Sequence, residues 1–253
     1  MKVIDISYHN GNIDFNKVRQ DEVEGVIIRA GYGNGNIDNQ FHKYIADAIK
    51  VGLHIGIYWF SYAYTIQMAD VEAKHCIKVI EQYRKYIDLP VFFDWEYDSF
   101  KYAGKHGVSP DKSLITAMHT VFCQVIYNAG YMVGYYLNLD YSKNYIDENK
   151  LRSYKRWFAR YTDVPQKDCY LWQYSSKGSV KGISGNVDMD ILNIDITKQK
   201  SDDKIVAEVI KGHWGSGNDR RQRLTKAGYD YRHIQDLVNQ AMKQLEKEKD
   251  NGK

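Results

Sequence analysis

Two carboxylic acids end an apolar, aromatic segment, Leu89–Tyr97, whose composition is typical of a buried β-strand. Side chains alternate between the faces of a strand, so we expect Asp94 and Glu96 to point to one side, roughly 6.5–7 Å apart. Burying two carboxylates is costly unless they line a cleft, because each must pair or take up a proton. Such a pair suits cleavage of a glycosidic bond, in which one acid protonates the leaving oxygen and one anion stabilises the positive centre.

Short apolar strands alternate with amphipathic helices up to about residue 196. The expected strands are Lys2–Ser7, Gly25–Gly31, His54–Tyr62, Leu89–Tyr97, Tyr131–Leu139, Arg156–Tyr161, Tyr170–Tyr174 and Val187–Asn193. The expected helices are Phe15–Asp21, Asn39–Val51, Thr65–Tyr86, Asp111–Asn128 and Asp147–Tyr154. Alternation of this kind implies parallel strands with right-handed crossovers, but the gaps between the last three strands are too short for full helices. The expected fold is therefore α/β, a distorted β/α barrel of eight strands with reduced final crossovers.

The active site of a β/α barrel lies at the C-terminal ends of its strands. This rule adds Asp5 and Asp188 to the two acids above, and four inward-facing acids would make a poor core. The polar and aromatic residues that it places beside them are Tyr58, Trp59, Tyr62, Tyr136, Asn138, Arg160, Trp172 and Gln173. Two structural alternatives stay open: the aromatic rings can pack in the core, and Glu96 can pair with Arg29 or Arg160.

The aromatic content is high, with 22 Tyr and 5 Trp among 253 residues. The rings can serve core packing or a carbohydrate cleft, where they stack on sugar faces. Cys76, Cys123 and Cys169 fit no metal or disulfide spacing, so we expect buried, reduced thiols. The eight histidines form no zinc motif, and we expect neither a metal nor another cofactor.

Charge is distributed unevenly along the chain. Residues 1–196 carry 22 basic and 23 acidic side chains, whereas residues 197–253 carry 13 and 9. A basic C-terminal segment favours attachment to an anionic polymer such as a cell wall or a nucleic acid. No nucleic-acid-binding motif accompanies it, so the nucleic acid is the weaker alternative.

The N-terminus enters a strand directly and has neither the apolar core nor the cleavage site of a signal peptide. No apolar run is long enough to cross a membrane, so membrane insertion is not expected. We expect synthesis in the cytoplasm, and an extracellular target would require another export route. The oligomeric state stays open.

The last quarter of the chain has its own organisation. Residues 197–203 are polar without an apolar pattern and are expected to be a linker after a domain of residues 1–196. Residues 204–253 are expected to form three short helices around Trp214, Leu224 and Tyr229, a very small core. The last ten residues are charged, and we expect them to be frayed.

Taken together, residues 1–196 resemble family 25 glycoside hydrolases, the lysozyme family found in many phage endolysins. The motifs that carry this resemblance are Asp5–Gly11, Ile28–Gly33, Asp94–Glu96, Leu171–Ser175 and Gly185–Asp190. They span nearly the whole domain in the order of the family. The C-terminal segment, from about Lys204 to Asn239, resembles a short cell-wall-binding repeat that is independent of choline, and it is present in one copy.

The resemblance implies cleavage of the β-1,4 bond between N-acetylmuramic acid and N-acetylglucosamine in peptidoglycan. By position, Glu96 is the expected proton donor and Asp94 its acidic neighbour, with Asp5 and Asp188 as the other acids of the cleft. The expected substrate contacts come from Tyr62, Tyr136, Trp172, Tyr58, Arg29 and Gln173. The function would be that of a phage or prophage endolysin, or of an autolysin of the bacterium itself.

Three other functional classes of protein are alternatives to a lysozyme. A carbohydrate-binding protein without activity would not need all four acids. A peptidoglycan amidase or peptidase would need zinc ligands or a supported Cys–His pair, which the sequence lacks. A chitinase shares the paired acids, but the longer acidic run typical of that class is absent before Asp94.

Overall fold

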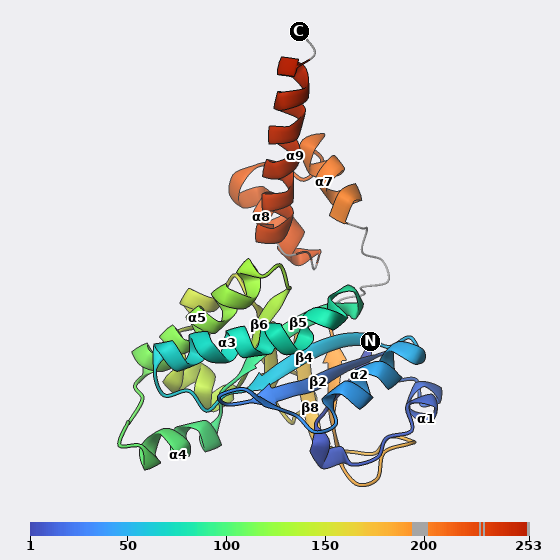
Figure 1. The fold of residues 1–253 in the computed structure, drawn as a ribbon, viewed down its shortest axis with the longest axis vertical. Coiled ribbons are helices and arrows are strands. Elements are labelled where there is room, and N and C mark those ends of the chain that lie inside the picture. Colours follow the sequence, from blue (N-terminus) through green and yellow to red (C-terminus); the bar gives the residue numbers. More distant parts are fainter. Residues whose placement is uncertain (194–201, 228, 230, 252–253) are drawn as a thin grey trace. The chain divides into compact units, whose positions relative to one another are not determined.

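The computed structural model describes residues 1–193, 202–227, 229 and 231–251. Contacts along the chain divide it into two compact units, residues 1–193 and residues 194–253 (Figure 1). The two units are described separately below.

The first unit is built on a closed ring of eight strands. In ring order they are β1 (Lys2–Ile6), β9 (Val187–Leu192), β8 (Leu171–Gly178), β7 (Lys155–Ala159), β6 (Val133–Asn138), β5 (Ile87–Asp94), β4 (His54–Phe60) and β2 (Gly25–Tyr32). Parallel pairing of β1 with β2 closes the ring, and the two-residue strand β3 (Asn36–Ile37) adds a hairpin to β2. The predicted barrel of eight strands is confirmed.

Helices follow the parallel strands and pack outside the ring (Figure 1). They are α1 (Phe15–Gln20), α2 (Phe41–Lys50), α3 (Ile66–Ile80), α4 (Tyr97–Lys105), α5 (Lys112–Asn128) and α6 (Glu148–Leu151). The side chains of Thr65 and Asp111 accept backbone N–H groups at the starts of α3 and α5, and such caps fix where a helix begins. Within residues 155–193 the structure has no helix, which confirms the reduced final crossovers.

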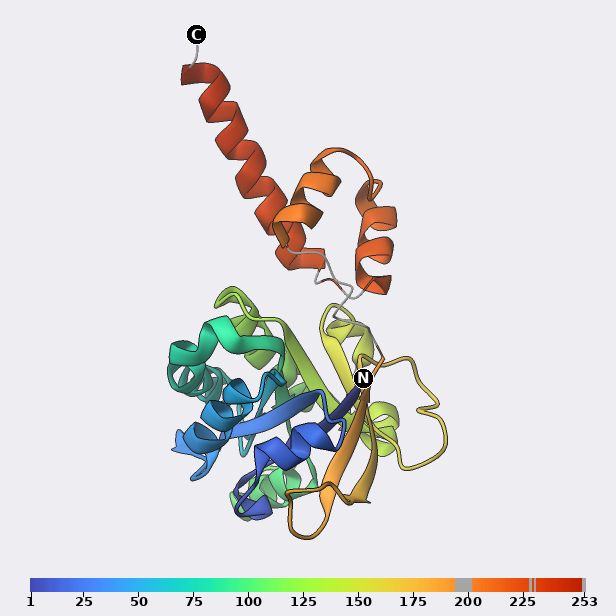
Figure 2. The same cartoon turned by 90° about the vertical axis from the view of Figure 1, so that its right-hand side faces the viewer.

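The last strand of the ring departs from the expected parallel arrangement. Strand β9 pairs antiparallel with both β8 and β1, beside the N-terminal strand in Figure 2. Only residues 179–186 separate β8 from β9, a length that suits a hairpin and not a crossover. Asp188 therefore lies at the beginning of its strand, at the same edge of the ring as the C-terminal ends of the parallel strands.

The segment that carries the paired acids also differs from the expectation. Strand β5 ends at Asp94, and Glu96 is the residue that precedes helix α4. The backbone N–H of Glu96 donates to the hydroxyl of Ser99 at 3.0 Å, which turns the chain into the helix. Helix α4 was not predicted, although its buried residues lie on one face, because it is short and follows the strand directly.

The main apolar cluster of the first unit comes from outward-facing strand residues and the inward faces of the helices. Its largest fully buried rings include Trp59, Trp95, Phe93 and Phe122. Other buried apolar side chains, among them Ile27, Phe92 and Trp157, lie outside this cluster. The three cysteines are buried and free, as predicted. A core of this size can tolerate a polar cleft at one end of the ring.

The second unit contains α7 (Asp202–Ile210), α8 (Gly217–Lys226) and α9 (Tyr231–Asn251). Leu224 and Tyr229 are buried, and Trp214 packs against them with its ring 5.8 Å from that of Tyr229, so the predicted core is confirmed. Helix α9 continues to Asn251, which corrects the expected short helix and frayed end.

The predicted linker, residues 197–203, falls mostly outside the described residues, and its last two residues begin α7. Among the described residues, no helix combines the length and the apolar character needed to cross a membrane.

Candidate active site

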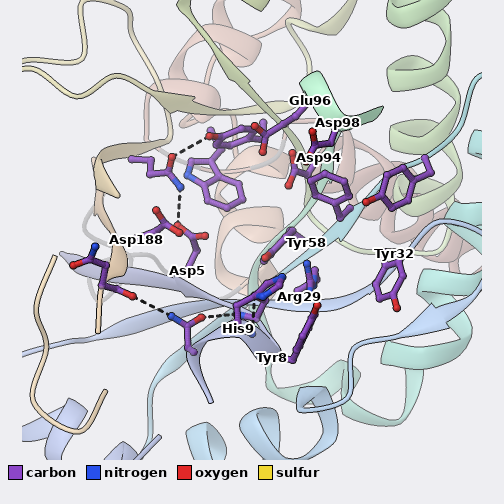
Figure 3. Close-up of a pocket in the computed structure, with 18 of the residues that line it drawn as sticks. Asp5, Tyr8, His9, Arg29, Tyr32, Tyr58, Asp94, Glu96, Asp98 and Asp188 are labelled. Atoms are coloured by element: carbon purple, nitrogen blue, oxygen red, sulfur yellow. Dashed lines mark hydrogen bonds between the residues drawn. The ribbon is translucent and has the colours of Figure 1, made fainter. Parts of the chain in front are cut away.

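A cavity of ≈ 590 Å³ opens at the end of the ring where the parallel strands terminate. All four predicted acids line it, with Asp94 and Glu96 on one side and Asp5 and Asp188 on the other (Figure 3). The predicted contact residues that also line the cavity are Arg29, Tyr58, Tyr62, Tyr136 and Gln173. The structure therefore brings together acids that lie more than 180 residues apart in the sequence.

Hydrogen bonds to the neighbouring β4–α3 connection hold the loop that carries Asp94 and Glu96. The carbonyl of Asp94 accepts the backbone N–H of Ser61 at 2.7 Å. The hydroxyl of Ser99, which accepts the N–H of Glu96, donates to the carbonyl of Ser61 at 2.6 Å and is fully buried. The indole of Trp95 donates to the carbonyl of Ala63 at 2.8 Å. Trp95, between the two acids, and Ser99, in the first turn of α4, thus fix the backbone of the acidic pair.

The electrostatics of this pair favour retention of a proton near neutral pH. Burial raises the pKa of Glu96 to about 7, and the charge of Asp188 adds to the effect. Burial and then the nearby Glu96 raise the pKa of Asp94 well above its usual value. The pKa of each group depends on the other, because the charge of Glu96 raises that of Asp94 while the contact with Asp94 lowers that of Glu96. The two groups therefore titrate as a coupled pair. Such a pair can give a proton to a leaving group and keep an anion beside it.

Asp5 and Asp188 are paired across β1 and β9, opposite the first two acids. Burial raises the pKa of Asp188 to about 6 and that of Asp5 well above its usual value. The amide of Gln173 donates to Asp5 Oδ2 at 2.9 Å and accepts the hydroxyl hydrogens of Tyr136 and Tyr161, each at 3.0 Å. Gln173 therefore orients Asp5 and ties it to the far wall of the cavity.

A fifth acid, Asp190, lies behind the cavity and was missed as a site residue. It is fully buried, and its Oδ1 accepts the indole N–H of Trp157 at 2.7 Å. Burial raises its pKa to about 8. The alternation of Asp188 and Asp190 along one strand was the signal that could have identified it.

Arg29 is held by a partner other than Glu96. Its Nε donates to Asp38 Oδ2 at 2.8 Å, and both side chains are almost fully buried. The guanidinium lies 4.9 Å from the ring centre of Tyr8 and 5.5 Å from that of Tyr32. Within the described part of the chain, Glu96 makes no ion pair with Arg29 or Arg160, so the structural alternative for Glu96 is not observed.

The predicted aromatic contacts differ in their placement. Tyr58 and Tyr136 are largely buried against Trp157, so they present mainly their hydroxyl groups to the cavity. Tyr62 is half-buried and presents a ring. Trp172 does not line the cavity. Its ring lies in the apolar core, and its indole donates to the carbonyl of Arg160 at 2.8 Å.

Three further tyrosines line the cavity that sequence reasoning did not select as site residues. Tyr8 follows β1 and is 42% exposed, Tyr161 follows β7 and is 55% exposed, and Tyr32 ends β2. Tyr8 and Tyr32 come directly after predicted strands and Tyr161 ends one, which was the available signal.

A second hollow of ≈ 650 Å³ adjoins the first, and the two share Glu96, Tyr136 and Tyr161. Glu96 thus stands where two open spaces meet, as expected of an acid that protonates a bond inside a longer chain. Among the described residues, no cluster of His, Cys, Asp and Glu has the geometry of a metal site.

A barrel of this kind with acids at one end is typical of a class of glycoside hydrolases. Residues 4–183 match the sequence profile of Glycosyl hydrolases family 25, and residues 203–242 match the CW_7 repeat. The chain therefore belongs to glycosyl hydrolase family 25.

Two curated relatives are similar to the chain. The autolytic lysozyme of Clostridium acetobutylicum is 31% identical over 193 residues, which is 75% of this chain and 55% of the relative. The lysozyme of Streptococcus phage Cp-7 is 25% identical over 258 residues, which is 94% of this chain and 69% of the relative.

Solved structures show the same fold. The modular autolysin LytC from Streptococcus pneumoniae has a TM-score of 0.66 and 30% identity, covering 75% of this chain and 46% of that one. It has also been solved with a synthetic peptidoglycan ligand. The catalytic domain of an endolysin from a Listeria monocytogenes bacteriophage has a TM-score of 0.65 and 25% identity, with coverage of 78% and 94%. The chain spans about half the length of the two autolysins named here.

Proposed function

We propose that this protein is a lysozyme that hydrolyses the β-1,4 bond between N-acetylmuramic acid and N-acetylglucosamine in peptidoglycan. The observation that carries the proposal is the Asp94–Glu96 pair in the cavity at the end of the barrel, with Glu96 where the two hollows meet. Membership of glycosyl hydrolase family 25 and likeness to two lysozymes support it.

In the proposed reaction, Glu96 donates its proton to the glycosidic oxygen as the bond from that oxygen to the anomeric carbon breaks. Its elevated pKa keeps it protonated near neutral pH, as a general acid requires. With Glu96 protonated, Asp94 serves as the anion of the pair. It can orient the 2-acetamido group of the sugar, whose carbonyl oxygen attacks the anomeric carbon. Water then opens the cyclic intermediate, returns a proton to Glu96 and gives net retention.

A competing route uses Asp5 or Asp188 to activate water for direct attack, which inverts the anomeric carbon. These acids lie across the cavity from the proton donor (Figure 3). Proton NMR of the first-formed anomer separates the two routes. The retained anomer supports assistance by the acetamido group, and the inverted anomer excludes it.

The bond that is cleaved can be identified directly. Purified peptidoglycan is incubated with the protein, the new reducing ends are reduced with borohydride, and the sugar alcohol is identified. We expect muramicitol, with none produced by the Glu96→Gln variant. Glucosaminitol would show a different glycosidase, and free peptide stems would show an amidase.

We also propose that the C-terminal unit anchors the enzyme to the wall. Its match to the CW_7 repeat supports this role. Charge alone is a weak basis, because Arg220 bonds the carbonyl of Gly215 and the amide of Gln235, and Arg223 pairs with Asp219. A variant ending at Asn193 should lose more activity on whole cells than on soluble wall fragments. Equal clearing of cells by both forms would contradict the anchoring role.

The biological setting that we propose is lysis of a bacterial host by a phage or prophage. The enzyme would be made in the cytoplasm and reach the wall after a holin or lysis has opened the membrane. The phage lysozyme among the relatives supports this setting, and the clostridial autolytic lysozyme supports an autolysin instead. Expression in the host with and without a holin tests it: lysis without the holin would favour the autolysin.

A further inference from the structure

The two hollows that meet at Glu96 differ in charge. The acids of the first hollow are Asp5, Asp94, Glu96, Asp98 and Asp188, and its one arginine is paired with a buried aspartate. The second hollow is lined by two cations, Lys143 and Arg160, and by one carboxylate, Asp140, besides Glu96. An anionic group on a bound chain would be repelled by the first hollow and attracted by the second.

The two cations of the second hollow are available to a ligand. In the described part of the barrel, neither Lys143 nor Arg160 forms an ion pair, although Arg160 Nε donates to the amide oxygen of Gln166 at 2.9 Å. Asp140 already accepts the hydroxyl of Tyr97 at 2.7 Å and the amide of Asn144 at 2.6 Å. It therefore competes little for the two cations.

The backbone at both cations is anchored while their charged ends are not. Arg160 follows β7, where its N–H donates to the carbonyl of Gln173 at 2.9 Å and its carbonyl accepts the indole of Trp172. Lys143 lies in a π-helical turn, Tyr141–Tyr145, after β6, and its carbonyl accepts Lys112 Nζ at 3.2 Å. The backbone of both residues is therefore held in place, directly after the neighbouring strands β6 and β7. This suits a recognition site, since little backbone must be ordered on binding.

We propose that the second hollow binds carboxylates of the peptide stem that N-acetylmuramic acid carries in peptidoglycan, through Lys143 and Arg160. The inference rests on the proposed function and deepens it. N-acetylglucosamine is neutral, whereas the stem on muramic acid carries carboxylates, so the contrast between the hollows fixes where a stem can lie. The guanidinium offers a bidentate donor set for a carboxylate, and the ammonium adds a second charge.

The experiment compares two substrates that differ only in stem charge. One is a preparation of uncross-linked glycan strands with their stems, freed of teichoic acid. In the other, the stem carboxyl groups are converted to methylamides. We expect kcat/KM of the unmodified enzyme to fall about tenfold on the neutral substrate, the size of one charge-assisted contact. The double variant Lys143→Met, Arg160→Met should fall about as much on the native substrate and show no preference between the two.

The control variant is Lys150→Met, an exposed lysine that lies outside both hollows and changes net charge in the same direction. It should keep the full preference for the charged stem. Equal cleavage of both substrates by the unmodified enzyme, with muramic acid at the new ends, would overturn the inference and leave the proposed function standing. Absence of cleavage of either substrate would overturn both. A preference that survives in the double variant would also overturn the assignment to these two residues.

Discussion

The barrel and the C-terminal unit place their polar groups in opposite ways. The barrel contains a core of 45 buried apolar side chains and also buries acids, with Asp5, Asp94 and Asp190 all less than a tenth exposed. Among its described residues, the C-terminal unit has a core of six buried side chains and no buried acid. Only a large core can offset the desolvation of several carboxyl groups, because each costs free energy that packing elsewhere must supply. The comparison predicts that the chemical reaction, and the free-energy cost of buried acids, are confined to the barrel.

The largest expected effect is on catalysis in the barrel. The Glu96→Gln variant keeps the shape of the side chain but cannot donate a proton, so kcat on peptidoglycan should fall about a thousandfold. Release of new reducing ends measures it. Glu81→Gln, an exposed acid outside the cavity, serves as the control and should behave as the unmodified enzyme. Wall cleavage by folded Glu96→Gln at more than a tenth of the normal rate would remove Glu96 as the proton donor.

The small core of the C-terminal unit should be fragile. Leu224→Ala removes a fully buried side chain and should cost about 2–4 kcal/mol, enough to unfold so small a core. Hydrogen exchange of the unit should increase, while cleavage of soluble wall fragments by the barrel stays unchanged. Leu245→Ala, whose leucine is 44% exposed, is the matched control. Loss of soluble activity in Leu224→Ala would show that the units are not independent.

The buried acids of the cavity should also weaken the barrel. The pKa of Glu96 is about 7 in the folded protein, above its usual 4.5, so the folded state loses stability as the pH rises through this interval. Glu96→Gln should therefore stabilise the protein by up to about 3 kcal/mol at pH 8 and by almost nothing at pH 4. Denaturant unfolding at both values measures it. An equal gain at both pH values would mean that packing, and not charge, is the cause.

The two acids of β9 should differ in their effect on catalysis. Asp188 lines the cavity, whereas Asp190 lies behind it, so Asp188→Asn should lower kcat about 10- to 100-fold and Asp190→Asn less than tenfold. Since Asn can still accept the bond from Trp157, the second variant keeps that contact. A larger loss of kcat for Asp190→Asn than for Asp188→Asn would show that Asp190 is the more important of the two acids.

The smallest expected effect concerns the backbone of the acidic pair. Ser99→Ala removes both the acceptor for the Glu96 N–H and the donor to Ser61, and should lower kcat about tenfold with little change in KM. The alkaline limb of the pH profile should shift as well, because the environment of Glu96 changes. Ser99→Cys, which retains a weak donor and acceptor, should recover part of the loss. A change in stability alone would make Ser99 merely structural.

Sequence alone predicted the ring of strands and the gathering of four acids at one end of it. Strand periodicity and the position of acids at strand ends are local patterns. The direction of β9 was wrong, since a strand pattern does not encode direction; the short connection before it, residues 179–186, does favour a hairpin. Glu96 points into the cavity as expected, but it precedes helix α4 and is not part of strand β5. Its backbone, at φ −128°, continues the extended direction past the end of β5.

Other features depend on contacts between distant residues and leave no local pattern. The pairing of Arg29 with Asp38, rather than with Glu96, is decided by the hairpin of β2 and β3. Trp172 and Tyr161 both fall near predicted strand ends, yet one packs in the core and the other lines the cavity. Their faces follow from how β7 and β8 twist around the ring.

The closure of the ring by β1 and β9 has a consequence for the order of folding. The N-terminal ammonium of Met1 donates to the carbonyl of Leu192, and Asp5 faces Asp188 across the same seam. Joining segments so far apart carries a large loop-closure entropy, which locally folded parts of the chain must already have reduced. During synthesis, Asp5 and Asp188 cannot meet until the last strand has left the ribosome. The acidic end of the barrel is thereby incomplete until the whole barrel exists.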